Sequence, residues 1–356
     1  MTGVREKFAG ENASRDEPVT PPCGFSSTKS KTEPKPSLVM KPIIPFALLG
    51  ALFAVGAANA QSSTTPVGYV TQQLNANSFN LLGLTLQTPV AVSGDFEAVA
   101  GATLTDSDVA DFAAVLPAGR TYILEVTSGG SVGVTQDFVT VSGSTITLPT
   151  AITVAADDTS RIRVAPTLEE VFGTTTSVLT KGFNAGAADN IWIPTGGGNY
   201  ARYFLHTSNV WRNSATSADS PNVPLVYLDG ALIEKKGAAA SLTVTGEVKT
   251  NATNVVVETG FNVLSVMYPA SSTLQNLGLE DDLTAGFNAG AADNVWVPGA
   301  GGTYTRYFRH TSGVWRNSAT SADVLTDVEL PSAIWIERKG AAATLDLTPP
   351  TSYASL

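Results

Sequence analysis

Two histidines occupy matching positions in two nearly identical stretches of the chain, and they are the first side chains to consider for chemistry. His206 and His310 each stand one residue after a Tyr-Phe pair and precede Thr-Ser. A catalytic histidine needs a positioned Ser, Asp or Glu partner, and the sequence holds no G-x-S-x-G motif or equivalent. One histidine per stretch is also too few for a metal centre, which usually takes three or more protein ligands. We therefore expect these histidines to have structural or surface roles, and we assign no catalytic residue, metal ligand or cofactor.

The alternative is a hydrolase that acts on an extracellular polymer. It would use His206 and His310, or a carboxylate pair such as Asp281 and Asp282. Neighbouring residues on a strand point to opposite faces of a sheet, which weakens the case for this aspartate pair.

A second repeated group is the segment G-A-A-D-N, which ends in Asp189-Asn190 and again in Asp293-Asn294. Asp and Asn before a strand most simply accept hydrogen bonds from backbone amides and so close a turn. Calcium also takes Asp and Asn oxygens, but the spaced acidic loop of a calcium site is missing. Turn closure is the favoured interpretation, and calcium is kept as the alternative.

Aromatic and arginine side chains recur along the repeated stretches and could contact a ligand. Exposed Trp and Tyr faces stack on sugars or peptides, and arginine beside them can stack or bind carboxylates. The equally simple alternative is packing in a core or between the copies, above all for Trp192 and Trp296, which stand between aliphatic residues. The candidate binding residues are Trp211, Trp315, Tyr203, Tyr307, Arg202, Arg306, His206 and His310.

The glycine runs do not indicate a nucleotide site. Gly196-Gly197-Gly198 and Gly301-Gly302 stand between expected strands, and neither run has the lysine or the following helix that a phosphate loop requires. Hairpin turns explain both.

The repeat itself is the clearest signal in the sequence. Residues 182–219 and 286–323 are identical at 30 of 38 positions with a constant offset of 104. Similarity continues downstream, where Leu232–Ala238 matches Trp335–Ala341. Upstream, Phe79–Leu82 matches Phe261–Leu264, and Gly68–Val70 is matched with Gly246–Val248. Repeats of this kind indicate tandem structural units.

The two units differ in length. Residues 167–173 align with 273–278, and the first unit holds about 76 additional residues, 90–165, before this segment. We expect a first β unit at 61–244 with an insertion at about 90–165, a second β unit at 245–350, and a tail at 351–356.

Local patterns favour short strands throughout. The insertion contains β-rich runs at 121–126, 138–141 and 145–148 with Gly/Ser turns between them. Each copy shows three further runs, which in the first copy are 203–205, 210–212 and 232–234. Residues 105–115 are expected to form one short helix, and Thr167 with Glu170 forms a capping-box pattern for a helical turn at 167–172. The fold class is all-β, with two tandem sandwich-like or barrel-like units and few helices.

An export signal precedes the repeats. Met40-Lys41 is a basic start, an apolar run covers 43–55, and Ala58-Asn59-Ala60 offers small residues for cleavage. We expect a signal peptide at 40–60, and residues 1–39 to be a disordered or spurious extension with Met40 as the true start. The alternative is a long signal segment that begins at Met1. No second apolar run follows, so no transmembrane segment is expected in the exported chain.

The exported chain has a composition suited to an extracellular protein. The single cysteine, Cys23, lies before the cleavage site, so residues 61–356 have no disulfide or thiolate site. They carry 14 basic and 26 acidic residues, a formal net charge of −12. This charge opposes binding to nucleic acid and anionic membranes.

Several segments together resemble a family of secreted proteins that occurs as many paralogues in verrucomicrobial bacteria. The matching residues are 66–71, 122–129, 167–173 and the series Tyr203-Phe204, Trp211-Arg212 and Glu234–Gly237. The resemblance covers most of 66–250 and makes the second unit a partial extra copy. Some relatives carry a C-terminal sorting anchor, which the ending Thr-Ser-Tyr-Ala-Ser-Leu lacks. The family offers no activity to carry over.

These observations predict an exported protein without catalytic activity. It is expected outside the cell, at the cell surface or in the periplasm. The expected partner is an extracellular polysaccharide, the cell envelope or a second copy of the chain.

Overall fold

The computed structural model describes residues 65–175 and 178–356, which form antiparallel sheets joined by short turns. All strand ladders run antiparallel, and each sheet in the described part of the chain is open. The predicted all-β class is confirmed, in the form of open sheets. The expected extension at 1–39 and signal peptide at 40–60 lie outside the described residues. No helix among the described residues is long and apolar enough to cross a membrane.

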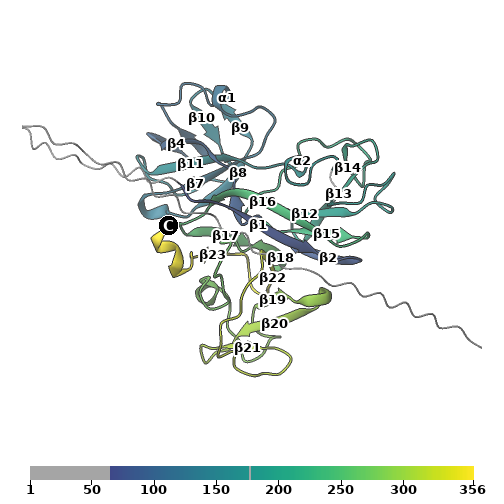
Figure 1. Ribbon diagram of the computed structural model, residues 1–356. Helices are drawn as coiled ribbons and strands as arrows, with labels where there is room; N and C mark the ends of the chain where they lie inside the picture. The colour runs from purple at the N-terminus through teal and green to yellow at the C-terminus, as the bar shows by residue number, and fades with distance from the viewer. Residues whose placement is uncertain (1–64, 176–177) are drawn as a thin grey trace, which may run out of the picture. The chain divides into compact units, whose positions relative to one another are not determined.

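Each copy of the repeat forms a five-stranded sheet, and the two sheets have the same strand order. The first sheet runs β14 (Trp211–Asn213), β13 (Asn199–Leu205), β12 (Asn190–Gly196), β15 (Ala231–Lys235) and β2 (Ser78–Leu82). The second runs β21 (Trp315–Asn317), β20 (Tyr304–Arg309), β19 (Asn294–Pro298), β22 (Ala333–Arg338) and β18 (Gly260–Ser265). Figure 1 shows β18 to β22 in green to yellow-green. The strands expected at 203–205, 210–212 and 232–234 are present as parts of β13, β14 and β15.

A separate antiparallel ladder begins and ends each copy. In the first copy β1 (Val67–Leu74) pairs with β16 (Ala240–Val248), which also pairs with β3 (Leu86–Gln87). In the second copy β17 (Thr253–Val257) pairs with β23 (Ala343–Leu347).

The strand in the second copy that corresponds to β1 is β17. In both copies an asparagine in the next strand accepts a hydrogen bond from the connecting turn: Asn75 N donates to Asn80 at 2.7 Å, and Glu258 N donates to Asn262 at 2.9 Å. Gly246 instead lies in β16, directly opposite Gly68 in β1. Residues 68–70 and 246–248 are therefore partner strands of one ladder, and they are not equivalent starts of the two copies. The expected boundary at 244/245 falls inside β16.

The additional residues of the first copy form two four-stranded sheets with a core of their own. One sheet is β4 (Val90–Asp95), β11 (Thr159–Val164), β7 (Tyr122–Val126) and β8 (Thr135–Phe138). The other is β5 (Ala98–Ala100), β6 (Thr103–Thr105), β10 (Thr145–Thr147) and β9 (Thr140–Ser142). Phe96, Phe112, Tyr122, Phe138 and Ile162 are buried together between them. Apolar side chains from both sheets thus close a compact body, whose strands appear in blue in Figure 1.

Helices are few and short among the described residues. The expected helix at 105–115 reduces to α1 (Phe112–Val115), because Thr105 continues β6 and Asp111 caps the helix only from residue 112. The helical turn α2 (Leu168–Phe172) is confirmed, with the capping box of Thr167 and Glu170 formed in both directions. The short helix α3 (Leu279–Asp282) contains Asp281 and Asp282, so the expectation of a strand there is wrong. The expected tail at 351–356 is a 3-10 turn (Thr351–Ser355) with Tyr353 buried.

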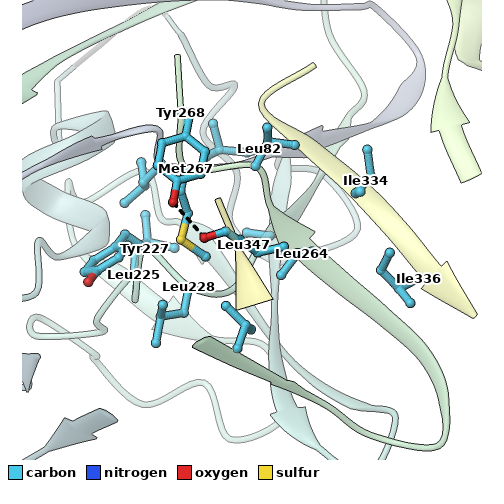
Figure 2. Packing of buried hydrophobic residues seen from close by; sticks show 14 of the residues in the cluster. Leu82, Leu225, Tyr227, Leu228, Leu264, Met267, Tyr268, Ile334, Ile336 and Leu347 are labelled. Carbon is cyan, nitrogen blue, oxygen red and sulfur yellow. Dashed lines mark hydrogen bonds between the residues drawn. The ribbon is translucent and has the colours of Figure 1, made fainter. Parts of the chain in front are cut away.

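The main hydrophobic core contains residues from both copies. Leu82, Ile191 and Ile233 of the first sheet belong to the same buried cluster as Leu264 and Ile336 of the second. Figure 2 shows part of this cluster, where the Tyr268 hydroxyl donates a hydrogen bond to the Leu347 carbonyl at 3.0 Å. Because the core is shared, the inner face of each sheet is covered and only the outer faces remain for ligands.

Two buried ion pairs connect the inserted body to the strands that follow the first sheet. Lys249 donates to Glu125 of β7, and both side chains are fully buried. Arg163 of β11 lies 2.5 Å from Glu247 of β16. Burial of paired charges costs desolvation energy, so these contacts fix the position of the insertion more than they add stability.

Candidate ligand-binding groove

An aromatic cavity of about 490 Å³ opens on the outer face of the second sheet. Its lining is Gly198, Tyr200, Phe261, Trp296, Tyr304 and Trp335. Tyr200 comes from the first sheet and the other rings come from the second. The cavity therefore exists only because the two copies lie together.

Strand register brings the rings of the second sheet side by side. Trp296 of β19 lies directly opposite Trp335 of β22, and Val263 of β18 lies on the other side of Trp335. Cross-strand neighbours share a face of the sheet, and residues two apart on one strand do so as well. Phe261 therefore joins the same face at the sheet edge, where 51% of its surface is exposed.

Ring contacts hold these side chains in a defined arrangement. Phe261 meets Trp335 edge-on, with ring centres 6.1 Å apart, and lies 6.4 Å from Trp296. Tyr200 also meets Trp335 edge-on, at 6.4 Å. Tilted and edge-to-face pairs of this kind are favourable beyond the area they bury. The cluster presents rigid aromatic faces that need little ordering when a ligand binds.

Polar contacts fix the central indole. The Trp296 Nε1 atom donates to Glu337 at 3.4 Å, and the Arg306 guanidinium lies 5.1 Å from the centre of the Trp296 ring. Ser318 accepts a hydrogen bond from Arg306 Nε at 2.7 Å. Arginine over an indole face is a cation–π contact. Arg306 thus supports the cavity wall from outside the lining.

The first sheet repeats the support but not the cavity. Trp192 donates to Glu234 at 3.4 Å, and the Arg202 guanidinium lies 5.0 Å from its ring centre. The residue opposite Trp192 is Leu232, where the second sheet has Trp335. Leu232 against Trp335 is therefore a large difference between the two outer faces, next to the smaller one of Leu81 against Val263.

Two further cavities adjoin the aromatic one and share residues with it. A cavity of about 350 Å³ shares Tyr304 and is lined by polar side chains that include Gln72, Gln73 and Asn75. We call these three neighbouring cavities, which share lining residues, the aromatic groove.

The third cavity, of about 360 Å³, forms the acidic end of the groove. It shares Tyr200, Phe261 and Gly198 with the aromatic cavity. Its carboxylates are those of Asp137, Asp229 and Glu258. The groove therefore has an aromatic middle, one neutral polar end and one acidic end, and among the described residues no Lys or Arg lines any of the three cavities.

Asp229 has an unusual environment at the acidic end. Its side chain keeps contact with solvent, yet protein walls surround it. This enclosure, with a smaller contribution from the charge of Asp137, raises the pKa of the Asp229 carboxyl to about 7. The pKa of Asp137 is also raised, by desolvation. Desolvation is therefore the main cause of both upward shifts, and the charge of Asp137 adds to it only at Asp229.

The sequence-predicted binding residues are distributed over both faces of the sheets. Trp211 and Trp315 are buried in the main core at 2% and 3% exposure, so neither indole is open to a ligand. Tyr203 and Tyr307 are partly buried against the same core. Arg202 and Arg306 lie on the outer face over Trp192 and Trp296. Among these residues, only Arg202 and Arg306 lie beside aromatic rings on an outer sheet face, as expected of ligand-contacting side chains.

The histidines are half-buried in isolated β-bridges directly after β13 and β20, outside the groove. His206 Nδ1 is 2.6 Å from the Ser208 hydroxyl, and His310 Nδ1 is 2.7 Å from that of Ser312. Each ring meets an exposed phenylalanine edge-on, Phe183 or Phe287, at 6.1 Å. No carboxylate of the described residues contacts either histidine, so a catalytic dyad is not formed there.

The G-A-A-D-N segments act as turn closures. Asp189 accepts from the backbone amides of Thr180 (2.7 Å), Lys236 (2.7 Å) and Gly237 (3.2 Å), and from Lys235 Nζ at 2.6 Å. Burial opposes ionisation, but these hydrogen bonds outweigh it and lower the pKa of Asp189. Asp293 accepts equivalent bonds from Thr284, Lys339 and Arg338. With their oxygens occupied in this way, the aspartates are not free to coordinate calcium.

A different acidic group has spacing compatible with a cation. Glu97, Asp106 and Asp108 of the inserted body place ligand oxygens within 4.8 Å of one another. Two oxygens are already used, since Asp106 accepts from Val109 N at 3.2 Å and Glu97 accepts from Ser107 N at 2.7 Å. The group is accounted for by these turn contacts.

Sequence reasoning missed most of the groove. Phe261, Tyr200 and Tyr304 stand in ordinary strand patterns, and the acidic residues Asp137 and Asp229 are far apart in the chain. The available signal was the difference between Leu232 and Trp335 at otherwise matched positions, since an added Trp at one copy only points to an unequal surface.

Comparison with known proteins gives no relative to transfer a function from. No family model, curated protein or solved structure matches this chain.

Proposed function

We propose that this chain is an exported, non-catalytic protein that binds a polysaccharide along the aromatic groove. The observation that carries the proposal is the set of five aromatic side chains in one solvent-open cavity with hydrogen-bonding residues at both ends. Sugar rings stack on aromatic faces, and their hydroxyl groups need polar partners beside those faces. The export signal and net negative charge of the sequence support a role outside the cell.

The length of the groove favours a polymer over a single sugar. Three adjoining cavities of about 490, 350 and 360 Å³ share lining residues, which gives space for several consecutive rings. Each cavity falls within or close to the size of a small-molecule site. A chain lying through all three would contact Gln72 and Asn75 at one end, Trp335 in the middle and Asp229 at the other end.

The test is calorimetric titration of the purified protein with neutral hexasaccharides of glucose, xylose, mannose and N-acetylglucosamine. We expect at least one to bind. Trp335→Leu should weaken it by about fivefold, because an aromatic stacking contact is worth about 1 kcal/mol. Phe183→Ala is the matched control, since Phe183 is 78% exposed but lies outside the groove. If no hexasaccharide binds, or if Trp335→Leu and Phe183→Ala act alike, the proposal is wrong.

A second candidate function is hydrolysis of the bound polymer. It is favoured by one observation, the presence of Asp137 and Asp229 from different elements in one cavity, with the pKa of Asp229 raised to about 7. A carboxyl group that is still protonated near neutral pH can act as a general acid beside an ionised carboxylate. Release of reducing ends that is lost in Asp229→Asn would establish this activity, and intact hexasaccharide after prolonged incubation would exclude it.

A further inference from the structure

We propose that the acidic end makes the aromatic groove selective for a cationic polysaccharide, an amino-sugar polymer with free amino groups. This inference rests on the proposed function, because it names the substrate class of the same groove. It adds to that function that the bound polysaccharide carries positive charge.

The carboxylates at this end lack cationic partners. Within the described residues, neither Asp137 nor Asp229 forms an ion pair, the Asp137 carboxyl accepts a hydrogen bond only from its own backbone amide, and both residues are exposed to solvent. By contrast, three fully buried carboxylates are neutralised: Asp189 by Lys235, Asp293 by Arg338 and Glu125 by Lys249. The acidic end is thus a place where the fold gathers negative charge and leaves it uncompensated.

The position of this charge relative to the rings defines the ligand. Tyr200 and Phe261 line both the aromatic cavity and the acidic cavity. A sugar ring stacked in the aromatic cavity would therefore place its substituents beside Asp137 and Asp229. An ammonium substituent gains from the carboxylates and from the adjacent aromatic faces, while a carboxylate or sulfate substituent is repelled.

Three other ionisable side chains, from three different elements, line the same cavity as Asp229. Asp137 comes from β8, Glu258 follows β17, and Tyr200 comes from β13. Tyr200 stays neutral because desolvation, aided by the charge of Asp229, raises its pKa. No group among them offers a positive charge, so the ligand is the source of compensation.

Protonation of Asp229 then links binding to pH. Enclosure and the charge of Asp137 raise the pKa of Asp229 to about 7, so the carboxyl loses its proton between about pH 6 and 8. A ligand with a fixed positive charge should therefore bind more tightly as the pH rises through this range. A neutral ligand should show no such gain.

The experiment compares two chemically matched probes, a glucosamine hexamer with N-trimethyl groups and the N-acetyl hexamer, by titration of the full chain. The fixed charge of the first probe removes any titration of the ligand itself. At pH 8 we expect the cationic hexamer to bind at least about tenfold more tightly than the neutral one. From pH 6 to 8 its affinity should rise about fivefold.

Variants separate charge selection from groove binding. Asp229→Asn and Asp137→Asn should each weaken the cationic hexamer by a severalfold larger factor than the N-acetyl hexamer, and Asp229→Asn should abolish the rise with pH. Asp281→Asn, an acidic residue of α3 outside the groove, is the matched control. Trp335→Leu should weaken both hexamers.

The outcomes distinguish the two proposals. Binding of the N-acetyl hexamer without a cationic preference would overturn the charge selection and leave the groove proposal standing. A preference for the cationic hexamer that persists in both Asp variants would also overturn the charge selection. Binding of a lysine-rich peptide as tightly as the cationic hexamer would overturn it too. Failure of both hexamers and of the other neutral sugars would remove the proposed function itself.

Discussion

Trp335 lies directly opposite Trp296 on adjacent strands of the second five-stranded sheet, at the register position where the first sheet pairs Leu232 with Trp192. The two sheets share strand order, supporting arginines and indole–carboxylate bonds. The groove arises where this one position departs from the repeat and where Tyr200 of the first copy meets it. The proposed ligand surface thus combines the outer face of the second sheet with Tyr200 of the first.

The effect of Trp335→Leu on stability should be small compared with its effect on binding. Leucine already occupies the equivalent position at Leu232, so the strand register accepts it. We expect a loss of about 1–2 kcal/mol in the free energy of unfolding, from chemical denaturation followed by circular dichroism. Trp315→Leu, at a position buried to 3% exposure in the main core, should cost more than about 3 kcal/mol. Equal losses in the two variants would contradict the assigned faces.

Removing the charge of Asp189 should strongly destabilise the fold. Lys235 is 2% exposed and would be left as a buried cation without its partner. The expected cost of Asp189→Asn is about 3–5 kcal/mol in urea unfolding. Asp219→Asn is the control, because Asp219 pairs with Arg212 at 2.9 Å but is 62% exposed, and it should cost less than about 1 kcal/mol.

The lowered pKa of Asp189 also predicts how stability changes at acidic pH. The pKa of Asp189 in the folded chain is lowered from its ordinary value of 3.8, since hydrogen bonds from Lys235 and backbone amides overcome the effect of burial. Its stabilisation is therefore fully present above about pH 4 and lost as the pH falls through the lowered pKa. The difference in unfolding free energy between the parent chain and Asp189→Asn should be constant from pH 8 to 5 and shrink below pH 4.

Asp229 should behave in the opposite way. Its pKa in the folded chain, about 7, is raised above the ordinary value of 3.8, so the folded state disfavours the ionised form. Asp229→Asn should stabilise the ligand-free chain, with a gain that is absent below about pH 4, grows between pH 4 and 7, and stays constant above pH 7. Thermal unfolding across this range measures the gain, and a melting temperature lower than that of the parent at pH 8 would contradict the assignment.

Variants of the Glu125–Lys249 ion pair test how the inserted body is attached to the segment that follows β16. Both side chains are fully buried, and Asn251 also donates to Glu125 at 2.5 Å. Glu125→Gln should cost about 3–5 kcal/mol because Lys249 keeps an unpaired charge, whose burial already lowers its pKa. The double variant Glu125→Leu with Lys249→Met should recover most of this loss in the same urea assay. A double variant as unstable as the single one would mean that the pair itself supplies net stability.

The sequence by itself determined the class of the fold and much of its local structure. Alternating strands, glycine turns and the capping box of Thr167 and Glu170 depend on neighbouring residues, and they are present as predicted. The near-identity of 182–219 and 286–323 likewise required two sheets of equal strand order. The helix expected at 105–115 is the local failure: Thr105 favours and joins strand β6, and Asp111 caps a helix that begins only at Phe112.

Only the tertiary structure decided which face of each strand meets the solvent. An aromatic residue on a short strand suits either face, and the shared core buried Trp211 and Trp315 while it left Trp335 half-buried and Phe261 exposed on the outer face. The acidic end depends still more on the fold, since Asp137 of the insertion and Asp229 of the first copy are brought together by contacts between distant segments. Long-range packing carries no signature in local sequence, and it alone assembled the aromatic groove.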